Sequence, residues 1–318
     1  MSTMTDVRGH RRFSALLAAL ALVGAACGSG DSDSTPGSTG DVETTVPVDS
    51  SDSTPGSAGD VETTFPVDSF AILANADVGV GRSRILIGIG EGGGRRLGSP
   101  AEGVTISVAH TDRPDAVQTT AGIFTWIIEG AIGLYRAEFE FDAPGLWRVV
   151  VIPETGDPLP PTGVNVLADT LAPAVGEPAP APQTPTLADS SFELITTDPT
   201  PDPRFYELSL AEAIGNGRKT VVVFSTPAFC QTAACGPLLD IVKGAAPDHP
   251  NVDFVHVEVY TNLTDPDFAP VPANLAPAVL GEWWNLPSEP WVFVVDEAGL
   301  VQARFEGVMA VEELEAEL

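Results

Sequence analysis

The chain has 318 residues, and its 44 acidic residues against 15 lysines and arginines give a formal net charge of −29 at pH 7. Nucleic-acid binding needs concentrated lysine and arginine, so this balance excludes a nucleic-acid partner. Much of the acid excess lies in segments that are poor in large apolar residues, where a solvated charged surface is expected.

Residues 1–26 have the pattern of an export signal. Three arginines precede an apolar run over residues 13–26, which is too short to span a bilayer comfortably. Small residues before Cys27 and a polar stretch after it resemble a bacterial lipoprotein signal, although Gly24 stands where such signals more often carry leucine. The resemblance implies a lipidated Cys27 and an extracytoplasmic protein anchored to the cell membrane. A plain secretory signal is the alternative.

Residues 27–69 are predicted to be a disordered acidic tether. The stretch from residue 28 onward is mostly Ser, Thr, Gly, Pro and acid, with no Lys or Arg. Such a segment cannot bury enough surface to offset its chain entropy. Residues 32–50 recur as residues 51–69 with two changes, which is a 19-residue tandem repeat. One extra copy lengthens a tether, because repeat folds need at least three packed units.

Residues 70–169 are predicted to form an all-β domain. Short apolar stretches beginning at residues 84, 103, 122, 133 and 146 are separated by Gly, Pro and Asp turns, which favours a β-sandwich. The last hairpin resembles that of immunoglobulin-like domains in bacterial surface proteins, so the expected fold is an immunoglobulin-like β-sandwich. We expect its three large aromatic residues to belong to the core: Trp126, Tyr135 and Trp147.

Residues 170–190 contain five prolines, which predict an extended, semi-rigid linker. An α/β domain is expected to follow over residues 191–318. Residues 221–224 form a continuous β-branched and aromatic run, typical of a strand buried on both faces. Cys230 and Cys235 come next, and the apolar spacing after them predicts a helix. A strand, a loop and a helix in this order place chemistry beyond the carboxyl end of the strand.

The segment over residues 219–240 resembles the active site of the thioredoxin-like superfamily, in particular its extracytoplasmic, TlpA-type thiol-disulfide branch. The stretch over residues 284–318 resembles the second half of that fold, in which a proline begins a strand, a Gly turn makes a hairpin and a helix closes the sheet. The resemblance covers residues 190–318. It implies a thioredoxin-like α/β fold with Pro290 as a cis-proline beside the cysteines.

The resemblance implies thiol-disulfide exchange on exported proteins. Cys230 is the expected nucleophile, because a helix N-terminus favours the thiolate over the thiol. Cys235 is the expected resolving cysteine. Pro290 shapes the site, and three residues are expected to form the lip on which a partner chain lies: Phe229, Trp284 and Glu289.

The spacing of the cysteines departs from the family pattern of Cys-x2-Cys. An offset of five residues on a regular helix places two residues about 140° apart and about 7.5 Å along the axis, whereas a disulfide needs Cα atoms within about 7 Å. One solution is a helix that begins late, at Gly236 and Pro237. The other solution is that the helix unwinds during the reaction, as it does in atypical two-cysteine peroxiredoxins. Their motif is similar, but Thr226 is one residue out of register, so a thiol peroxidase is an alternative function.

Thioredoxins carry a buried acid on the cysteine strand, and residues 221–224 offer none. Glu258 is a conceivable substitute, but its alternation with His256 and Tyr260 predicts a partly exposed strand face. A Cys2His metal site from Cys230, Cys235 and His256 is a further alternative, which the cysteine spacing disfavours.

The sequence predicts no metal and no cofactor. The glycine run over residues 88–94 lacks the helix that a phosphate-binding loop needs. The partners expected are thiols and disulfides of exported proteins, and the membrane through the lipid on Cys27, with the protein itself a monomer. The non-enzymatic alternative is a surface scaffold with a structural disulfide, which a reduction potential below about −300 mV would identify.

Overall fold

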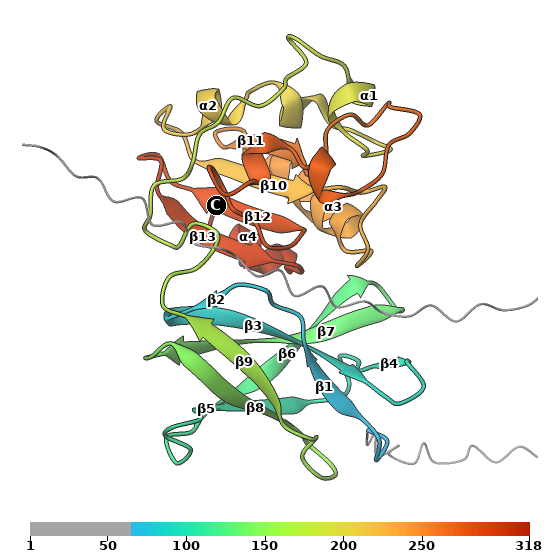
Figure 1. Cartoon of the computed structure of the whole chain (residues 1–318), viewed down its shortest axis with the longest axis vertical. Helices are drawn as coiled ribbons and strands as arrows, with labels where there is room; N and C mark the ends of the chain where they lie inside the picture. The colour runs from blue at the N-terminus through green and yellow to red at the C-terminus, as the bar shows by residue number, and fades with distance from the viewer. Residues whose placement is uncertain (1–64) are drawn as a thin grey trace, which may run out of the picture. The chain divides into compact units, whose positions relative to one another are not determined.

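A computed structural model describes residues 65–318 of the chain. The predicted export signal over residues 1–26, the lipidation site Cys27 and the tether over residues 28–64 lie outside the described residues, so those assignments stay predictions. Within the described part, the chain forms a nine-stranded sheet and then a four-stranded sheet (Figure 1).

The nine-stranded sheet is one continuous, curled layer with the order β1-β3-β7-β6-β5-β8-β9-β2, and β4 beside β3. Strand β2 is last in this order and β3 is second, although only Val80 separates the two strands in the sequence. Only the pair of β2 and β9 is parallel. The strands are β1 (Phe70–Leu73), β2 (Val78–Gly79), β3 (Gly81–Gly90), β4 (Arg96–Leu97), β5 (Val104–His110), β6 (Gln118–Ile128), β7 (Ile132–Phe141), β8 (Gly145–Pro153) and β9 (Thr162–Leu167).

The expected immunoglobulin-like sandwich of two separate sheets is therefore wrong. The physical reason is the length of β6, which pairs with β5 over residues 118–122 and with β7 over residues 123–128. One strand thus joins what would otherwise be two sheets. The core inside the curl includes Tyr135 and Trp147, both almost fully buried, whereas Trp126 is half-buried and meets Phe124 edge-on.

The four-stranded sheet has the order β11-β10-β12-β13. Strand β10 (Thr220–Ser225) runs parallel to β11 (Asp253–Glu258) and antiparallel to β12 (Trp291–Val295), which pairs antiparallel with β13 (Val301–Glu306). All six residues of β10 are buried. Val221 and Val223 face one core cluster and Val222 and Phe224 face another, as a strand covered on both sides requires.

The expected α/β thioredoxin-like fold is also wrong. Residues 65–318 are mostly β, with four α-helices, of which only α3 (Cys235–Ala245) exceeds five residues. The connection over residues 259–290 shows the physical reason: its six prolines lack the N–H donors that a helix needs. The remaining helical elements are α1 (Phe192–Ile195), α2 (Leu210–Ala213), α4 (Val311–Glu315) and the 3-10 turns η1 (Pro203–Tyr206), η2 (Ala246–Asp248), η3 (Pro272–Asn274) and η4 (Pro277–Val279).

In the described range, no helix combines the length and the apolar character needed to cross a membrane.

The proline-rich segment after β9 lies against the hairpin of β12 and β13. Gly176 N–H donates to Val301 O (2.8 Å) and Ala179 N–H donates to Gly299 O (2.9 Å). Ala172 is almost fully buried. These hydrogen bonds fix part of the expected linker to the four-stranded sheet.

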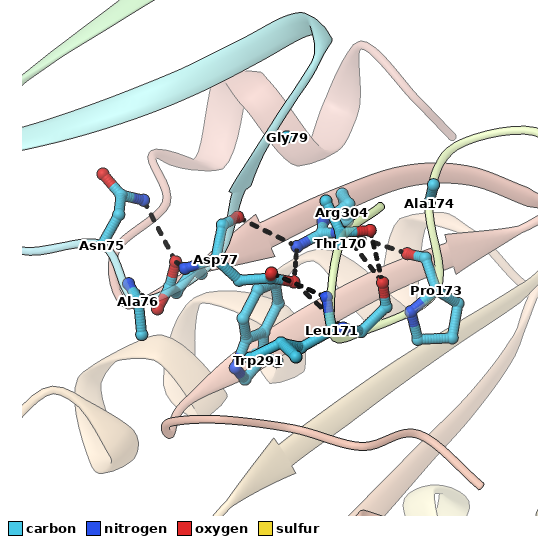
Figure 2. A network of polar contacts seen from close by, with 12 residues as sticks. Asn75, Ala76, Asp77, Gly79, Thr170, Leu171, Pro173, Ala174, Trp291 and Arg304 are labelled. Carbon is cyan, nitrogen blue, oxygen red and sulfur yellow. Dashed lines mark hydrogen bonds and ion pairs between the residues drawn. The ribbon is translucent and has the colours of Figure 1, made fainter. Parts of the chain in front are cut away.

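A buried ion pair connects the two sheets (Figure 2). Arg304 of β13 donates to Asp77 Oδ2 at 2.6 Å, and the Asp77 side chain is fully buried. The same carboxylate accepts backbone N–H bonds from Leu171 and Ala172. The Arg304 guanidinium also lies over the Trp291 ring, 4.9 Å from its centroid. Every face of this pair is therefore occupied by a specific partner.

Replacing Asp77 with alanine should leave the Arg304 guanidinium buried without its partner. We expect the free energy of unfolding to fall by about 3 kcal/mol, the cost typical of breaking a buried pair. Urea denaturation measures it. Arg82→Ala is the matched control, because its pair with Glu138 is exposed and should contribute little. An equal loss in the two variants would contradict this account.

Candidate redox site

Strand β10 ends in a short loop that carries the cysteine pair. Phe229 N–H donates to Thr226 O (3.1 Å), which turns the chain directly after the strand. Cys230 and Cys235 form a disulfide with Cα atoms 5.9 Å apart, inside the range that such bonds require. Helix α3 begins only at Cys235. Cys230 therefore lies in a loop before the helix, and the Cys-x4-Cys spacing is compatible with a bond.

The two cysteines differ in exposure. Cys235 is fully buried at the first turn of α3, whereas Cys230 is half-buried and reaches the surface. Cys230 Sγ accepts the backbone N–H of Cys235 and contacts Thr232 Oγ1, each at 3.3 Å. A helix N-terminus and an N–H donor both stabilise negative charge on sulfur. The geometry thus favours a thiolate at Cys230.

Glu258, the last residue of β11, is buried beside this loop. Its Oε2 accepts from Thr197 N–H (2.7 Å) and from Thr197 Oγ1 (3.0 Å). Burial raises the pKa of Glu258 to about 7, against the lowering effect of the hydroxyls of Thr226 and Thr197 and the Thr197 N–H. The predicted partly exposed strand face is therefore wrong, because the segment around Thr197 covers this end of β11.

Thr197 links Glu258 to the cysteine loop. The Thr197 hydroxyl donates to Glu258 and accepts the backbone N–H of Ala228, at 3.1 Å. Ala228 lies two residues before Cys230. A two-bond path thus runs from the buried carboxyl to the loop that carries the exposed sulfur.

Glu289 and Pro290 lie directly before β12, and the peptide bond between them is cis. Phe224 pairs with Trp291, so the antiparallel register places Thr226 opposite Glu289. Burial raises the pKa of Glu289 to about 7, and the charge of Glu258 acts in the same direction. Thr226 is thus next to both carboxyls.

Three oxygens at this place have no hydrogen-bond partner among the described residues. They are Thr226 Oγ1, Glu258 Oε1 and Glu289 Oε2, and all three are buried. Thr226 is close enough to lower the pKa of Glu258, but the two groups do not meet hydrogen-bond geometry. Buried polar atoms are normally satisfied, so this cluster has spare capacity to hold protons or water.

His256 does not join the site as a metal ligand. Its Nδ1 is 2.7 Å from the Tyr206 hydroxyl and its Nε2 is 2.9 Å from Ser225 Oγ. Burial lowers its pKa to about 4, so the ring is neutral at pH 7. Both ring nitrogens of His256 thus have partners within the protein, and both cysteines are in a disulfide. Among residues 65–318, no cluster of His, Cys, Asp and Glu has the arrangement of a metal site.

The expected lip residues occupy different places. Phe229 is half-buried and packs on Phe268, with ring centroids 4.7 Å apart. Trp284 is fully buried and packs between Phe224 and Phe293, so it belongs to the core and does not face a partner. Phe268 was missed from the sequence, because an aromatic residue in an irregular Pro/Asp segment carries no periodic signal.

Comparison of the chain with protein-family models, with curated proteins and with solved structures gives no match. The resemblance to extracytoplasmic thiol-disulfide proteins therefore stays a prediction, and the function is inferred from the geometry and chemistry of the site.

The raised pKa of Glu258 predicts a pH-dependent stability. The unfolded carboxyl ionises near 4.5 and the folded one near 7. Rising pH through this window therefore favours the unfolded state. We expect the free energy of unfolding of the wild type, relative to Glu258→Gln, to fall by about 3 kcal/mol between pH 4.5 and 7. Glu282→Gln, at an exposed position, is the matched control variant. If the difference in the free energy of unfolding between the wild type and Glu258→Gln does not change with pH, the buried Glu258 carboxyl does not have a raised pKa.

Proposed function

We propose that this protein is an extracytoplasmic thiol-disulfide oxidoreductase that acts on exported proteins through Cys230 and Cys235. In the reducing direction, the Cys230 thiolate attacks a partner disulfide, forms a mixed disulfide and releases one partner thiolate. Cys235 then attacks Cys230 Sγ, and the second partner thiolate leaves. Two electrons pass to the partner and the Cys230–Cys235 disulfide is formed. The reverse sequence oxidises a partner dithiol.

The unequal exposure of the two sulfurs is the observation that carries this proposal. A partner thiolate can reach the half-buried Cys230 but not Cys235, which is 0% exposed. The Cys235 N–H bond to Cys230 Sγ stabilises the thiolate that attacks or leaves. A disulfide with one reachable sulfur at a helix N-terminus fits exchange, in which each step has a defined attacking and leaving atom.

Glu258 is the proposed proton acceptor for the resolving step. Cys235 must lose its proton before it can attack the mixed disulfide, because the thiolate is the nucleophile. A carboxyl with a pKa of about 7 takes and returns a proton near neutral pH. Glu289, also raised to about 7, shares the same polar cluster. The two acids together give the site capacity for the protons that exchange releases.

The proposed location follows from the sequence alone. A lipid on Cys27 would hold the protein at the outer face of the cell membrane, where disulfides persist and exported proteins pass. Cys230 and Cys235 would then be the only cysteines left for redox chemistry, since the chain has three.

The reduction potential separates exchange from the alternative of a structural disulfide. We expect the reduction potential of the Cys230–Cys235 pair, measured by equilibration with glutathione buffers, to lie well above about −300 mV. Alkylation of the reduced protein should also modify Cys230 before Cys235, because only Cys230 is accessible. A potential below about −300 mV would instead assign the bond to a scaffold. The peroxidase alternative predicts consumption of hydrogen peroxide by the reduced protein.

Replacement of Cys235 with alanine should trap partners. Without the resolving thiol, the mixed disulfide at Cys230 cannot be released, so exported proteins should accumulate as covalent adducts on non-reducing gels. Cys230→Ala is the control and should trap none, since Cys235 is buried. Absence of adducts with the Cys235→Ala variant in cells would argue against catalysis.

A further inference from the structure

The carboxylate of Glu306, at the end of β13, joins three segments that are distant in the sequence. Glu306 is 6% exposed. Its Oε1 accepts from Ala76 N–H and from Ser288 Oγ, each at 2.7 Å. Its Oε2 accepts from Asn75 Nδ2 (3.2 Å) and from Asp77 N–H (3.4 Å). All four of these neighbours donate a hydrogen bond to the Glu306 side chain, so both of its oxygens act as acceptors.

One of the three segments carries the acid and the proline of the redox site. Ser288 Oγ, which donates to Glu306, also accepts from Trp291 Nε1 at 3.2 Å. On the other side, Gly307 N–H donates to Pro290 O at 2.8 Å. These two anchors lie on either side of Glu289. Its position opposite Thr226 is therefore set by the end of β13.

The other partners of Glu306 belong to the nine-stranded half of the protein. Asn75 is fixed to β3, because its Oδ1 accepts from Leu86 N–H at 2.6 Å. Asp77 is fixed by Arg304, and Figure 2 shows Asn75 and Asp77 side by side on one face of this junction. Residues 75–77 thus hold both oxygens of the Glu306 carboxylate, and Ala76 N–H shares Oε1 with Ser288.

We propose that Glu306 is a positioning residue for disulfide exchange at Cys230, and that residues 75–77 of the nine-stranded half hold it in place. Glu306 fixes residues 288–290 through Ser288, and these residues carry Glu289 and Pro290 to the end of β10. The proposal rests on the proposed function. It gives the nine-stranded half a role in the redox site, because the loop between β1 and β2 supplies three of the four donors to Glu306.

Ser288→Ala removes the hydrogen bond from Ser288 Oγ to Glu306 and disturbs the rest of the junction least. The full chain with Cys27→Ser serves as background, so that Cys230 and Cys235 are the only thiols. The rate constant of exchange with glutathione disulfide should fall on the order of 10-fold, because a small displacement of a positioning group is costly. The equilibrium constant with glutathione should stay unchanged, since the disulfide itself is not altered. Ser288→Thr keeps the hydroxyl and should restore the rate.

Two further variants separate positioning from general stability. Thr170→Val removes the hydrogen bond from Thr170 Oγ1 to Ala172 O (2.7 Å), which belongs to the same junction but does not reach Ser288. It should lower the unfolding midpoint and leave the exchange rate unchanged. Glu306→Gln puts a donor among four donors, so it should lower both the rate and the midpoint.

The outcomes are distinct. A slow Ser288→Ala variant with a normal Thr170→Val variant supports positioning. A Ser288→Ala variant that exchanges at the wild-type rate, or a Thr170→Val variant that is equally slow, overturns it and leaves the proposed function intact. If the background protein itself does not exchange with glutathione disulfide, both proposals are refuted together.

Discussion

The complete burial of β10 is the constraint on which the C-terminal half depends. Valine and phenylalanine side chains cover both faces of the strand, so no polar group can lie along its length without loss of hydration. Polar chemistry is confined to the point where the strand ends, at Ser225 and Thr226. There the neighbouring strands contribute Glu258 from one side and Glu289 from the other. The disulfide loop follows at the same edge, which concentrates the reactive groups in one place.

Four carboxyl groups at the junction and at the redox site, those of Asp77, Glu306, Glu258 and Glu289, have different surroundings, and the difference indicates different roles. Asp77 accepts from a guanidinium and two N–H donors, and Glu306 accepts from four donors, so both carboxyl groups have hydrogen-bond partners on both oxygens. Glu258 and Glu289 each keep one oxygen without a partner. The satisfied pair holds the two sheets together. The unsatisfied pair has pKa values near neutrality and is therefore suited to proton transfer.

The halves meet through an apolar cluster of Leu86, Leu134 and Val308 and through polar contacts, and one set of these polar contacts lies next to the residues that precede β12. Arg304 stacks on Trp291, and Trp291 donates to Ser288, so the junction is continuous with the loop that carries Glu289. This continuity gives a physical reason for joining a curled β sheet to a cysteine-bearing sheet in one chain. The loop between β1 and β2 adds three donors to the one that Ser288 supplies from the second sheet's own connection.

The sequence by itself determined the buried strand over residues 221–224 and the location of Pro290 directly before a strand, because hydrophobic runs and proline act locally. It did not determine the fold class, since whether β6 joins two sheets depends on how far its partners extend. It also misplaced Glu258 and Trp284. Their burial is decided by the segments around Thr197 and Phe224, which are about 60 residues away in the sequence, and alternation along one strand says nothing about what covers it.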